Sequence, residues 1–435
     1  MNYKLLLIFI LSFGFASCQN YQRNKTDIQT WQNTATIYEI LPFQYPDNGG
    51  FKSIIKQRGH LRKLFINTIS LLPITLAEGN EKVSVANPYK VKDYKKIDPK
   101  LGTEKEFEGL LDSFHAIKIK CLLEFDFSQT AFDHPWYKDH NEYYIKNSND
   151  SSNTKFALDI SNVALQKEIL AIISYWLKDY NIDGLVLRGL EKASKDFISK
   201  IYDLAVEKNN AILIIDANKE QLSNNSNPIG LLNKNLYSTL LKTMQDTFVM
   251  EDFMNIFSKD KSSGSNYYYV NYTHDVNAEI YIGSTQQIFD SQNKLVAVIS
   301  NYVNGVPMVF NGQDCPLFEK IDFKNRTPLN LKYHFNLDFY RSLFLHRYYN
   351  EALQVKSGES IENISNSKCI IAIKRKYGNQ TTILMANLCS TTENYTLTEE
   401  IGVVSELFTH AKLEFKSNKS FPLNGYQYIV VTNKY

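Results

Sequence analysis

Ile182-Asp183-Gly184-Leu185-Val186-Leu187-Arg188 is the stretch that decides the fold. A short run of apolar and small residues, bounded by charged ones, is typical of a strand buried in a parallel sheet. Alternate residues of a strand face the same side, so Val186 and Arg188 share a face. The stretch therefore predicts a buried strand that carries a basic side chain at its carboxyl end.

Similar apolar runs occur on both sides of this stretch along the chain. Apolar runs that predict strands lie at residues 37–43, 68–74, 119–127, 184–190, 211–217 and, weakly, 247–250, and again at 267–272 and 306–310. Amphipathic runs with apolar residues at i, i+3 and i+4 predict helices between them, at 105–116, 164–180 and 194–207. Eight strands interleaved with helices predict a closed (β/α)8 TIM barrel over residues 31–350, with a short Asn/Ser-rich insertion at 131–156.

The pattern of apolar residues changes after residue 350. Short β-rich runs lie at residues 369–374, 381–387, 405–408 and 426–432. They predict a small antiparallel β domain over residues 351–435.

The composition of the chain excludes two classes of protein. The chain has 435 residues, with 48 Lys+Arg against 46 Asp+Glu, which gives a formal net charge of +2. This balance excludes nucleic-acid binding through a strongly basic surface. A hydrophobic content of 43% is too high for a disordered chain.

The N-terminus has the pattern of a bacterial lipoprotein signal. Lys4 precedes an apolar run at 5–15, which is too short to span a membrane, and Ala16-Ser17-Cys18 follows it. We expect a signal peptide over 1–18, a lipid on Cys18 and a tether over 19–30. The chain would then be lipid-anchored in the cell envelope, on the periplasmic or the outer surface. The alternative is an ordinary secretory signal that is cleaved near Ala16.

The other four cysteines predict free, buried thiols. Cys121, Cys315, Cys369 and Cys389 form no Cys-x-x-Cys pair, and no histidine lies at zinc-ligand spacing from them. The pattern predicts neither a metal site nor a disulfide framework.

Charged side chains gather where the predicted strands end. Glu124 and Asp126 share a face of the third strand, Arg188 ends the fourth, Asp216 ends the fifth, and Asp275 follows the seventh with His274. Catalytic residues of TIM barrels lie at the carboxyl ends of the strands, so these groups are expected to face a common mouth.

Ordered segments along almost the whole chain resemble the α-amylase family, glycoside hydrolase family 13. The matching segments are Ile37-Tyr38-Glu39-Ile40, Asn87-Pro88-Tyr89, Ile97-Asp98-Pro99, His134-Pro135-Trp136, Ile182-Asp183-Gly184, Thr273-His274-Asp275 and Gly312-Gln313-Asp314. The resemblance implies retaining chemistry on α-glucosidic bonds. It implies an aspartate nucleophile after strand four, a glutamic acid after strand five and a second aspartate after strand seven.

The sequence departs from the family at the positions that carry the chemistry. Arg188 stands at the nucleophile position, and the arginine expected two residues earlier is Val186. Asp216 stands at the acid position, one methylene shorter than glutamate. A guanidinium neither loses its proton near neutrality nor forms a glycosyl ester.

The third strand departs from the family as well. Its Asp-x-x-x-Asn-His pattern is replaced by Glu124-x-x-x-Ser128-Gln129, which removes the asparagine that binds calcium in many members. Calcium is therefore doubtful, and no cofactor is expected. The resemblance marks Asp216 and Asp275 as the remaining catalytic positions. It also marks Tyr89, Gln129 and His274 as substrate-binding positions, although core packing is an equal alternative for Tyr89.

These departures favour a degenerate, non-hydrolytic member that binds α-glucan or a partner. One alternative is a weakly active or altered glycosidase or transglycosylase, with Glu124 or Asp126 as a substitute nucleophile. Another is a structural partner subunit, like the amino-acid-transporter heavy chains that resemble this family. In the degenerate site we expect Arg188 to lie within about 4 Å of Asp216 or Asp275.

Overall fold

The computed structural model describes most of the chain from Ile28 onward. The described residues are 28–45, 49–78, 88–146, 156–223, 227–244, 250–253, 267–272, 292–315, 328–329, 331, 334–355, 361–365, 367–397 and 400–434. The signal peptide and Cys18 lie outside these ranges, as do His274 and Asp275. Among the described helices, none is long and apolar enough to cross a membrane.

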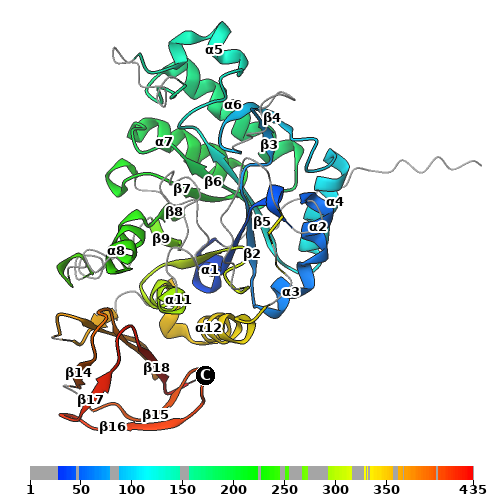
Figure 1. The fold of residues 1–435 in the computed structure, drawn as a ribbon. Helices are drawn as coiled ribbons and strands as arrows, with labels where there is room; N and C mark the ends of the chain where they lie inside the picture. The colour runs from blue at the N-terminus through cyan, green and yellow to red at the C-terminus, as the bar shows by residue number, and fades with distance from the viewer. Residues whose placement is uncertain are drawn as a thin grey trace, which may run out of the picture.

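A closed barrel of eight parallel strands forms the body of the molecule (Figure 1), and it confirms the predicted fold. Its strands are β1 (Ile37–Ile40), β2 (Thr68–Leu71), β5 (Lys120–Asp126), β6 (Gly184–Arg188), β7 (Ile212–Ile215), β8 (Ile229–Leu232), β9 (Tyr267–Tyr272) and β10 (Val306–Phe310). The first and last strands pair with each other, with Ile37 opposite Met308, and this pairing closes the barrel.

One barrel strand lies where the sequence did not predict it. The sixth strand is β8, which pairs with β7 and β9, and not the weak run near 247–250. β8 has only four residues, and Gly230 interrupts its apolar run, so it gives a weak strand signal. A Cβ on Gly230 would lie 2.8 Å from Ile214 Cγ1 and 3.0 Å from the Tyr268 ring, so the close approach of neighbouring strands explains the glycine.

Helices surround the barrel. They are α1 (Ile28–Thr34), α2 (Gly50–Lys56), α3 (Arg58–Lys63), α4 (Glu104–His115), α6 (Val163–Asp179), α7 (Lys195–Tyr202), α8 (Lys234–Met244), α11 (Asn293–Tyr302) and α12 (Leu337–Tyr349). Local sequence fixes several of their ends. Thr103 and Glu106 form a capping box at the start of α4, and the side chain of Asn162 caps α6.

Two additions to the barrel lie between β2 and α6. A hairpin of β3 (Thr75–Ala77) and β4 (Val91–Ile97) precedes α4. The predicted insertion contains the short helix α5 (Pro135–Asp139), at the top of Figure 1. His134 caps this helix, and its ring packs against Trp136 with the ring centroids 4.5 Å apart.

The C-terminal part is a separate antiparallel β domain, as predicted. Its main sheet has the order β11-β12-β13-β18-β15-β16, and β14 pairs with β17 beside it. The strands are β11 (Ile361–Asn363), β12 (Ile370–Tyr377), β13 (Gln380–Asn387), β14 (Glu393–Thr396), β15 (Gly402–Glu406), β16 (Lys412–Phe415), β17 (Ser420–Leu423) and β18 (Tyr428–Thr432).

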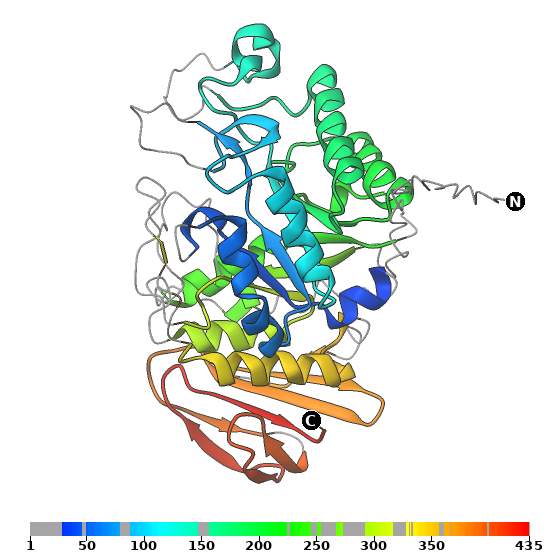
Figure 2. The ribbon, with the colours of Figure 1, turned by 90° about the vertical axis from the view of Figure 1, so that its right-hand side faces the viewer.

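The β domain packs against the barrel through α11 and α12, which lie between the two in both views (Figures 1 and 2). Its side chains Ile371, Leu384 and Val430 belong to the same apolar cluster as the barrel core. Arg375 of β12 is fully buried at this junction. Its guanidinium donates to the carbonyl oxygens of Tyr302, Val303 and Gln354.

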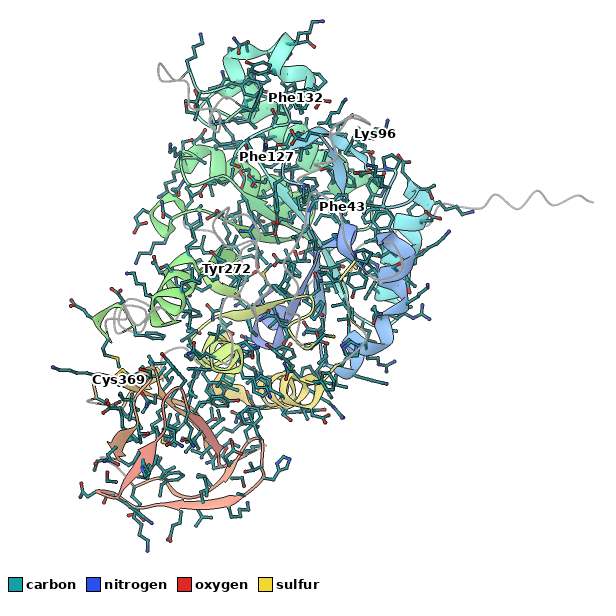
Figure 3. The ribbon with its side chains drawn as sticks, in the orientation of Figure 1. Phe43, Lys96, Phe127, Phe132, Tyr272 and Cys369 are labelled. Atoms are coloured by element: carbon teal, nitrogen blue, oxygen red, sulfur yellow. A yellow bond between two sulfur atoms is a disulfide. The ribbon has the colours of Figure 1, made fainter. Side chains whose placement is uncertain are left out.

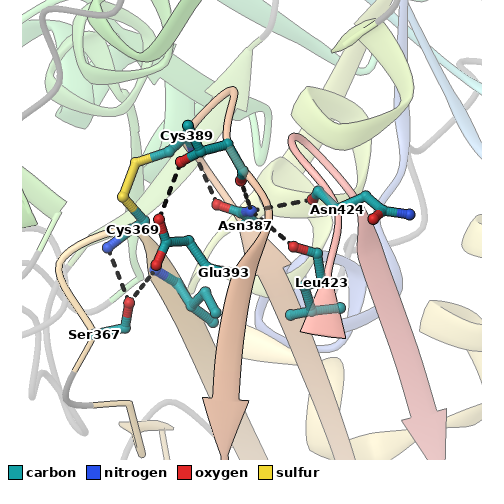
Figure 4. The surroundings of a disulfide bond; sticks show 9 residues. Ser367, Cys369, Asn387, Cys389, Glu393, Leu423 and Asn424 are labelled. Carbon is teal, nitrogen blue, oxygen red and sulfur yellow. Dashed lines mark hydrogen bonds between the residues drawn. A yellow bond between two sulfur atoms is a disulfide. The ribbon is translucent and has the colours of Figure 1, made fainter. Parts of the chain in front are cut away.

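Two of the four cysteines predicted to be free thiols are joined instead. Cys369 and Cys389 form a disulfide that links the start of β12 to the chain just after β13 (Figure 4). Because β12 and β13 are adjacent antiparallel strands, residues 20 positions apart come together, a pairing that the sequence spacing alone does not reveal. Cys121 and Cys315 are free and buried, as predicted.

Candidate functional site

Arg188 lies at the carboxyl end of β6 and is buried in the barrel mouth, with its side chain 4% exposed. Its Nε donates a 2.7 Å hydrogen bond to Glu124 Oε1 of β5, and its Nη2 lies 3.6 Å from Glu39 Oε1 of β1. The guanidinium carbon is 5.9 Å from the ring centroid of Tyr272, which is labelled in Figure 3. Three barrel strands and an aromatic ring therefore hold the cation at the nucleophile position.

Of the two partners expected for Arg188, Asp216 is wrong, and Asp275 lies outside the described residues. Within the described part of the chain, the carboxylates at ion-pair distance from Arg188 are those of Glu124 and Glu39. Asp216 pairs with Lys234 instead, with Oδ2 2.8 Å from Nζ. Strand register explains the difference. Glu124 lies opposite Val186, so the long side chain of Arg188 reaches back along β6 to a carboxylate one level deeper in the barrel.

Glu124 is fully buried and is held by two donors. Its Oε1 accepts from Arg188 and, at 3.1 Å, from the hydroxyl of Tyr89. Burial raises the pKa of the Glu124 carboxyl, against the opposing effect of the Arg188 cation. Glu124 is therefore part of an ion pair inside the barrel and is not exposed to a substrate in the mouth.

Asp126 has a structural contact at the end of the same strand. The backbone N–H of Ser128 donates a 2.7 Å hydrogen bond to Asp126 Oδ1, which closes the turn after β5. Burial raises the pKa of Asp126 as well. Neither candidate for a substitute nucleophile is an exposed carboxylate.

Asp216, Lys234 and Glu191 form a second charged group at the ends of β6, β7 and β8. Lys234 Nζ lies 2.6 Å from Glu191 Oε1 and 2.8 Å from Asp216 Oδ2. The Asp216 N–H donates to the carbonyl of Leu187, which fixes the residue beside β6. Asn233 accepts from the N–H of Leu236 and so holds the start of α8, where Lys234 lies.

Burial gives Asp216 the properties of a proton donor. It raises the pKa of Asp216 to about 6, although the hydrogen bond and the charge of Lys234 act in the opposite direction. For Glu191, burial is outweighed by its hydrogen bonds and the charge of Lys234 taken together, and the pKa lies below its usual value. Two carboxyls whose environments separate their pKa values are typical of acid–base sites.

A pocket of about 620 Å³ opens beside this group. Polar groups of several chemical types line it, including the carboxylates of Asp216 and Glu191, the ammonium of Lys234, the amide of Asn233 and the ring of Tyr269. Hydroxyl-rich ligands need this mixture of donors and acceptors, together with an aromatic surface.

The predicted substrate-binding residues Tyr89 and Gln129 do not line this pocket. Tyr89 is 2% exposed, and its hydroxyl is bonded to Glu124, so its ring packs in the core. Gln129 is half-buried on the loop after β5, where its backbone pairs with Ala157, away from the residues that line the pocket. His274 and Asp275 lie outside the described residues.

Three charged residues of the site were missed from the sequence. Lys234 follows β8, the strand that sequence reasoning placed elsewhere. Glu191 lies three residues beyond Arg188, in a segment read as loop. Glu39 is quoted in the first strand, where the alternation of faces with Tyr38 gives the signal that it points into the barrel.

Together these groups include a carboxyl that can act as an acid, whereas the position expected for the nucleophile holds no carboxylate. Asp216 has a raised pKa and borders a pocket, whereas the nucleophile position carries a cation that is paired inward. Substrate hydroxyls can be bound and a proton can be donated. A glycosyl ester has no carboxylate on which to form at Arg188.

Comparison with known proteins agrees with the family resemblance. Residues 16–157 match the family model described as "Alpha amylase, catalytic domain". An oligo-1,6-glucosidase of Heyndrickxia coagulans is 29% identical over 112 residues, which covers 25% of this chain and 19% of that protein. Alpha-amylase 2 of Dictyoglomus thermophilum is 21% identical over 339 residues, 68% of this chain and 58% of that one.

A transporter heavy chain also occurs among the relatives. The amino acid transporter heavy chain SLC3A1 of Mus musculus is 30% identical over 128 residues, which covers 26% of this chain and 18% of that protein. The chain thus matches only about a fifth of the length of this relative and of the glucosidase.

Solved structures match over nearly the entire fold. A noncanonic maltogenic alpha-amylase from Thermotoga neapolitana superposes with a TM-score of 0.77 at 19% identity, covering 93% of this chain and 99% of that one. An alpha-amylase from Lactobacillus plantarum gives 0.76 at 15% identity, covering 93% and 100%. At these identities the likeness establishes the fold.

Proposed function

We propose that this chain, which has the fold of the α-amylases, is a lipid-anchored protein of the bacterial cell envelope that binds α-glucan without hydrolysing it. The observation that carries the proposal is the buried Arg188 at the nucleophile position, paired with Glu124 and Glu39. Retaining hydrolysis needs a carboxylate there to form the glycosyl-enzyme.

Arg188 also lacks the negative charge that would stabilise an oxocarbenium-like centre. Its own positive charge is compensated by Glu124 and Glu39, so the loss at this position is that of a carboxylate and of the covalent route.

Binding is supported by the pocket beside Asp216. Its lining combines carboxylate, ammonium and amide groups with the Tyr269 ring, which suits the alternating hydroxyls and apolar faces of a glucan. This binding does not require a nucleophile.

The envelope location is supported by two independent features. The apolar run at 5–15 followed by Ala16-Ser17-Cys18 is the pattern of a lipoprotein signal. The Cys369–Cys389 disulfide is of the kind that persists in oxidising compartments outside the cytosol.

A second candidate function is a weak or altered glycosidase. The observation in its favour is the pKa of Asp216, raised to about 6 by burial, which is the property of a general acid. The similarity to a transporter heavy chain favours a third candidate, a structural subunit that binds protein and no sugar.

Turnover of an aryl α-glucoside and of maltooligosaccharides separates the first two candidates. We expect no turnover by the wild type. We expect turnover by a Val186→Arg/Arg188→Asp double variant, which restores the carboxylate and places a cation opposite Glu124. The double change is needed because Arg188→Asp alone would leave three buried acids together.

Turnover by the wild type that is lost in Asp216→Asn would contradict the proposal and support the weak enzyme. Asp196→Asn is the matched control, because Asp196 is an exposed carboxylate on α7 paired with Lys200. Its activity should equal that of the wild type in every assay.

Calorimetric titration with maltoheptaose tests binding directly. We expect saturable binding that is lost in Tyr269→Ala and Lys234→Met, both at the pocket. Tyr377→Ala, an exposed aromatic on the β domain, is the control and should bind normally. Absence of saturable binding by the wild type would favour the structural subunit.

A further inference from the structure

A cluster of nitrogen, oxygen and sulfur atoms lies next to Tyr38 of β1 and just beyond the end of β10. His60 of α3, Asp314 after β10 and His334 before α12 meet there, with one ligand atom of each within 4.8 Å of the others. His60 Nε2 lies 2.5 Å and His334 Nδ1 3.0 Å from the same atom, Asp314 Oδ2. Their imidazole rings stack with centroids 3.6 Å apart.

The other oxygen of Asp314 is held by the barrel. The hydroxyl of Tyr38 donates a 2.8 Å hydrogen bond to Asp314 Oδ1, and the N–H of Gly312 donates to the Tyr38 hydroxyl. This contact fixes the carboxylate and directs Oδ2 at the two histidines. Such an outer contact is typical of carboxylates that bind metals.

Cys315 supplies a fourth donor at the edge of the cluster, outside the group of ligand atoms that lie within 4.8 Å of one another. Its free Sγ lies 2.8 Å from His334 Nδ1 and 3.9 Å from Asp314 Oδ2. In a nucleophilic triad, the histidine uses one nitrogen for the nucleophile and the other for the carboxylate. Here the thiol and the carboxylate both contact Nδ1, so the three groups do not form a relay.

Among the described residues, the partners of Asp314 carry no permanent positive charge. The Asp314 side chain is 2% exposed, and no lysine or arginine within the described ranges forms an ion pair with it. Tyr38, His60 and His334 give this buried carboxylate three hydrogen-bond partners. A divalent ion between the two imidazoles and the carboxylate would add a permanent positive charge.

A second group with metal-binding residue types already has a positively charged partner. Asp183 contacts His115 Nε2 at 2.7 Å, but it also accepts from Lys120 Nζ at 3.2 Å and from the N–H of Cys121. Its charge is already compensated by Lys120.

We propose that His60, Asp314 and His334, with Cys315 as the fourth ligand, form a structural zinc site. Two imidazoles, a carboxylate and a thiolate are the ligand types that suit tetrahedral Zn²⁺ and do not suit calcium. The ion would join α3, the end of β10 and the segment before α12, at the place where the first and last barrel strands meet. The site is independent of glucan binding.

Titration of the chelator-treated purified chain with ZnCl₂ tests the proposal by calorimetry and thermal unfolding. We expect one Zn²⁺ per chain and a rise in Tm on binding. His60→Gln and His334→Gln should each weaken binding by roughly a hundredfold or more. Both side chains are partly exposed, at 13% and 25%, so these variants are expected to fold.

His140→Gln is the matched control, because His140 is an exposed histidine paired with Glu142 on the insertion. Co²⁺ provides a spectroscopic probe, and its thiolate charge-transfer band should disappear in Cys315→Ser. The proposal is overturned if Zn²⁺ does not bind, if both histidine variants bind like the wild type, or if His115→Gln removes binding instead. A cobalt spectrum that is unchanged in Cys315→Ser would overturn the fourth ligand.

Discussion

Arg188 puts a positive charge where the family resemblance expects a carboxylate, and it is paired with buried acids there. Its guanidinium lies against Glu124 and Glu39, so the buried negative charges of β5 and β1 are compensated inside the barrel. The residue type at the nucleophile position was readable from the sequence. Its partners were not, because they depend on how far a long side chain reaches along the neighbouring strand.

Removing Arg188 should destabilise the fold as well as change the site. Arg188→Met leaves Glu124 buried beside Tyr89 without its cation, and we expect a cost of about 3–5 kcal/mol in the free energy of unfolding. Urea unfolding measures this cost. Adding Glu124→Gln should recover part of it, with a coupling energy of about 1–3 kcal/mol in the double-mutant cycle.

Lys200→Met provides the comparison, because the Lys200–Asp196 pair is exposed. We expect this variant to lose no more than about 1 kcal/mol. If Arg188→Met were equally mild, the ion pair at the barrel mouth would not have the structural role given to it here.

Asp216 should give stability a recognisable pH dependence. Burial raises its pKa to about 6 in the folded chain, against about 4 for an unfolded aspartate. A raised carboxyl pKa stabilises the fold most below about pH 4, and this contribution is lost as the pH rises to about 6. Wild type should therefore lose stability relative to Asp216→Asn across that window.

Denaturant unfolding at several pH values between 4 and 7 measures the difference between the two proteins. Asp196→Asn shows the effect of removing a surface carboxylate. A difference that stays constant, or that moves in favour of the wild type as the pH rises, would show that burial does not dominate the Asp216 carboxyl.

At the scale of elements, the sequence was informative wherever an apolar run was long enough. The runs at 119–127 and 306–310 became β5 and β10, because a strand buried on both faces contains few polar residues. β8 was missed because its four residues include Gly230, which is required by the close approach of Ile214 and Tyr268. That requirement is a property of neighbouring strands, so it is invisible in the segment itself. Lys234, and with it the charged group of the pocket, was missed for the same reason.

The disulfide of the β domain gives the prediction that belongs to this scale. Replacing both Cys369 and Cys389 by alanine releases a closed loop with a sequence separation of 20 residues, and we expect a loss of about 3 kcal/mol in the stability of the domain. Urea unfolding with and without dithiothreitol measures it. Wild type should weaken when reduced, whereas the double variant should not respond, and a wild type that ignores the reductant would contradict this expectation.

At the scale of the whole molecule, the two domains share one interface. Arg375 connects them, since its buried guanidinium donates to the carbonyls of Tyr302 and Val303 at the end of α11 and to that of Gln354. Nothing in the alternating pattern of β12 distinguishes this arginine from a solvent-facing one. Its position became clear only with the barrel packed against it.

Arg375→Met should therefore weaken the junction. Three buried carbonyl oxygens would lose a charged donor, and we expect a cost of at least about 2 kcal/mol, seen as a lower Tm. Lys376→Met, the exposed neighbour on the same strand, is the control and should melt like the wild type. Equal melting temperatures for the two variants would mean that the apolar contacts alone hold the domains together.

The pairing of β1 with β10 has a consequence for how this chain is made. Ile37 pairs with Thr68 early in the chain, but its other partner, Met308, is made much later, so a shorter nascent chain cannot close the barrel. Open edges invite pairing with other chains, and contacts between distant residues form slowly. On the proposed export route the chain would cross a membrane before it folds, and these strands would pair only afterwards. We therefore expect its biogenesis to depend on holding chaperones until the last barrel strand arrives.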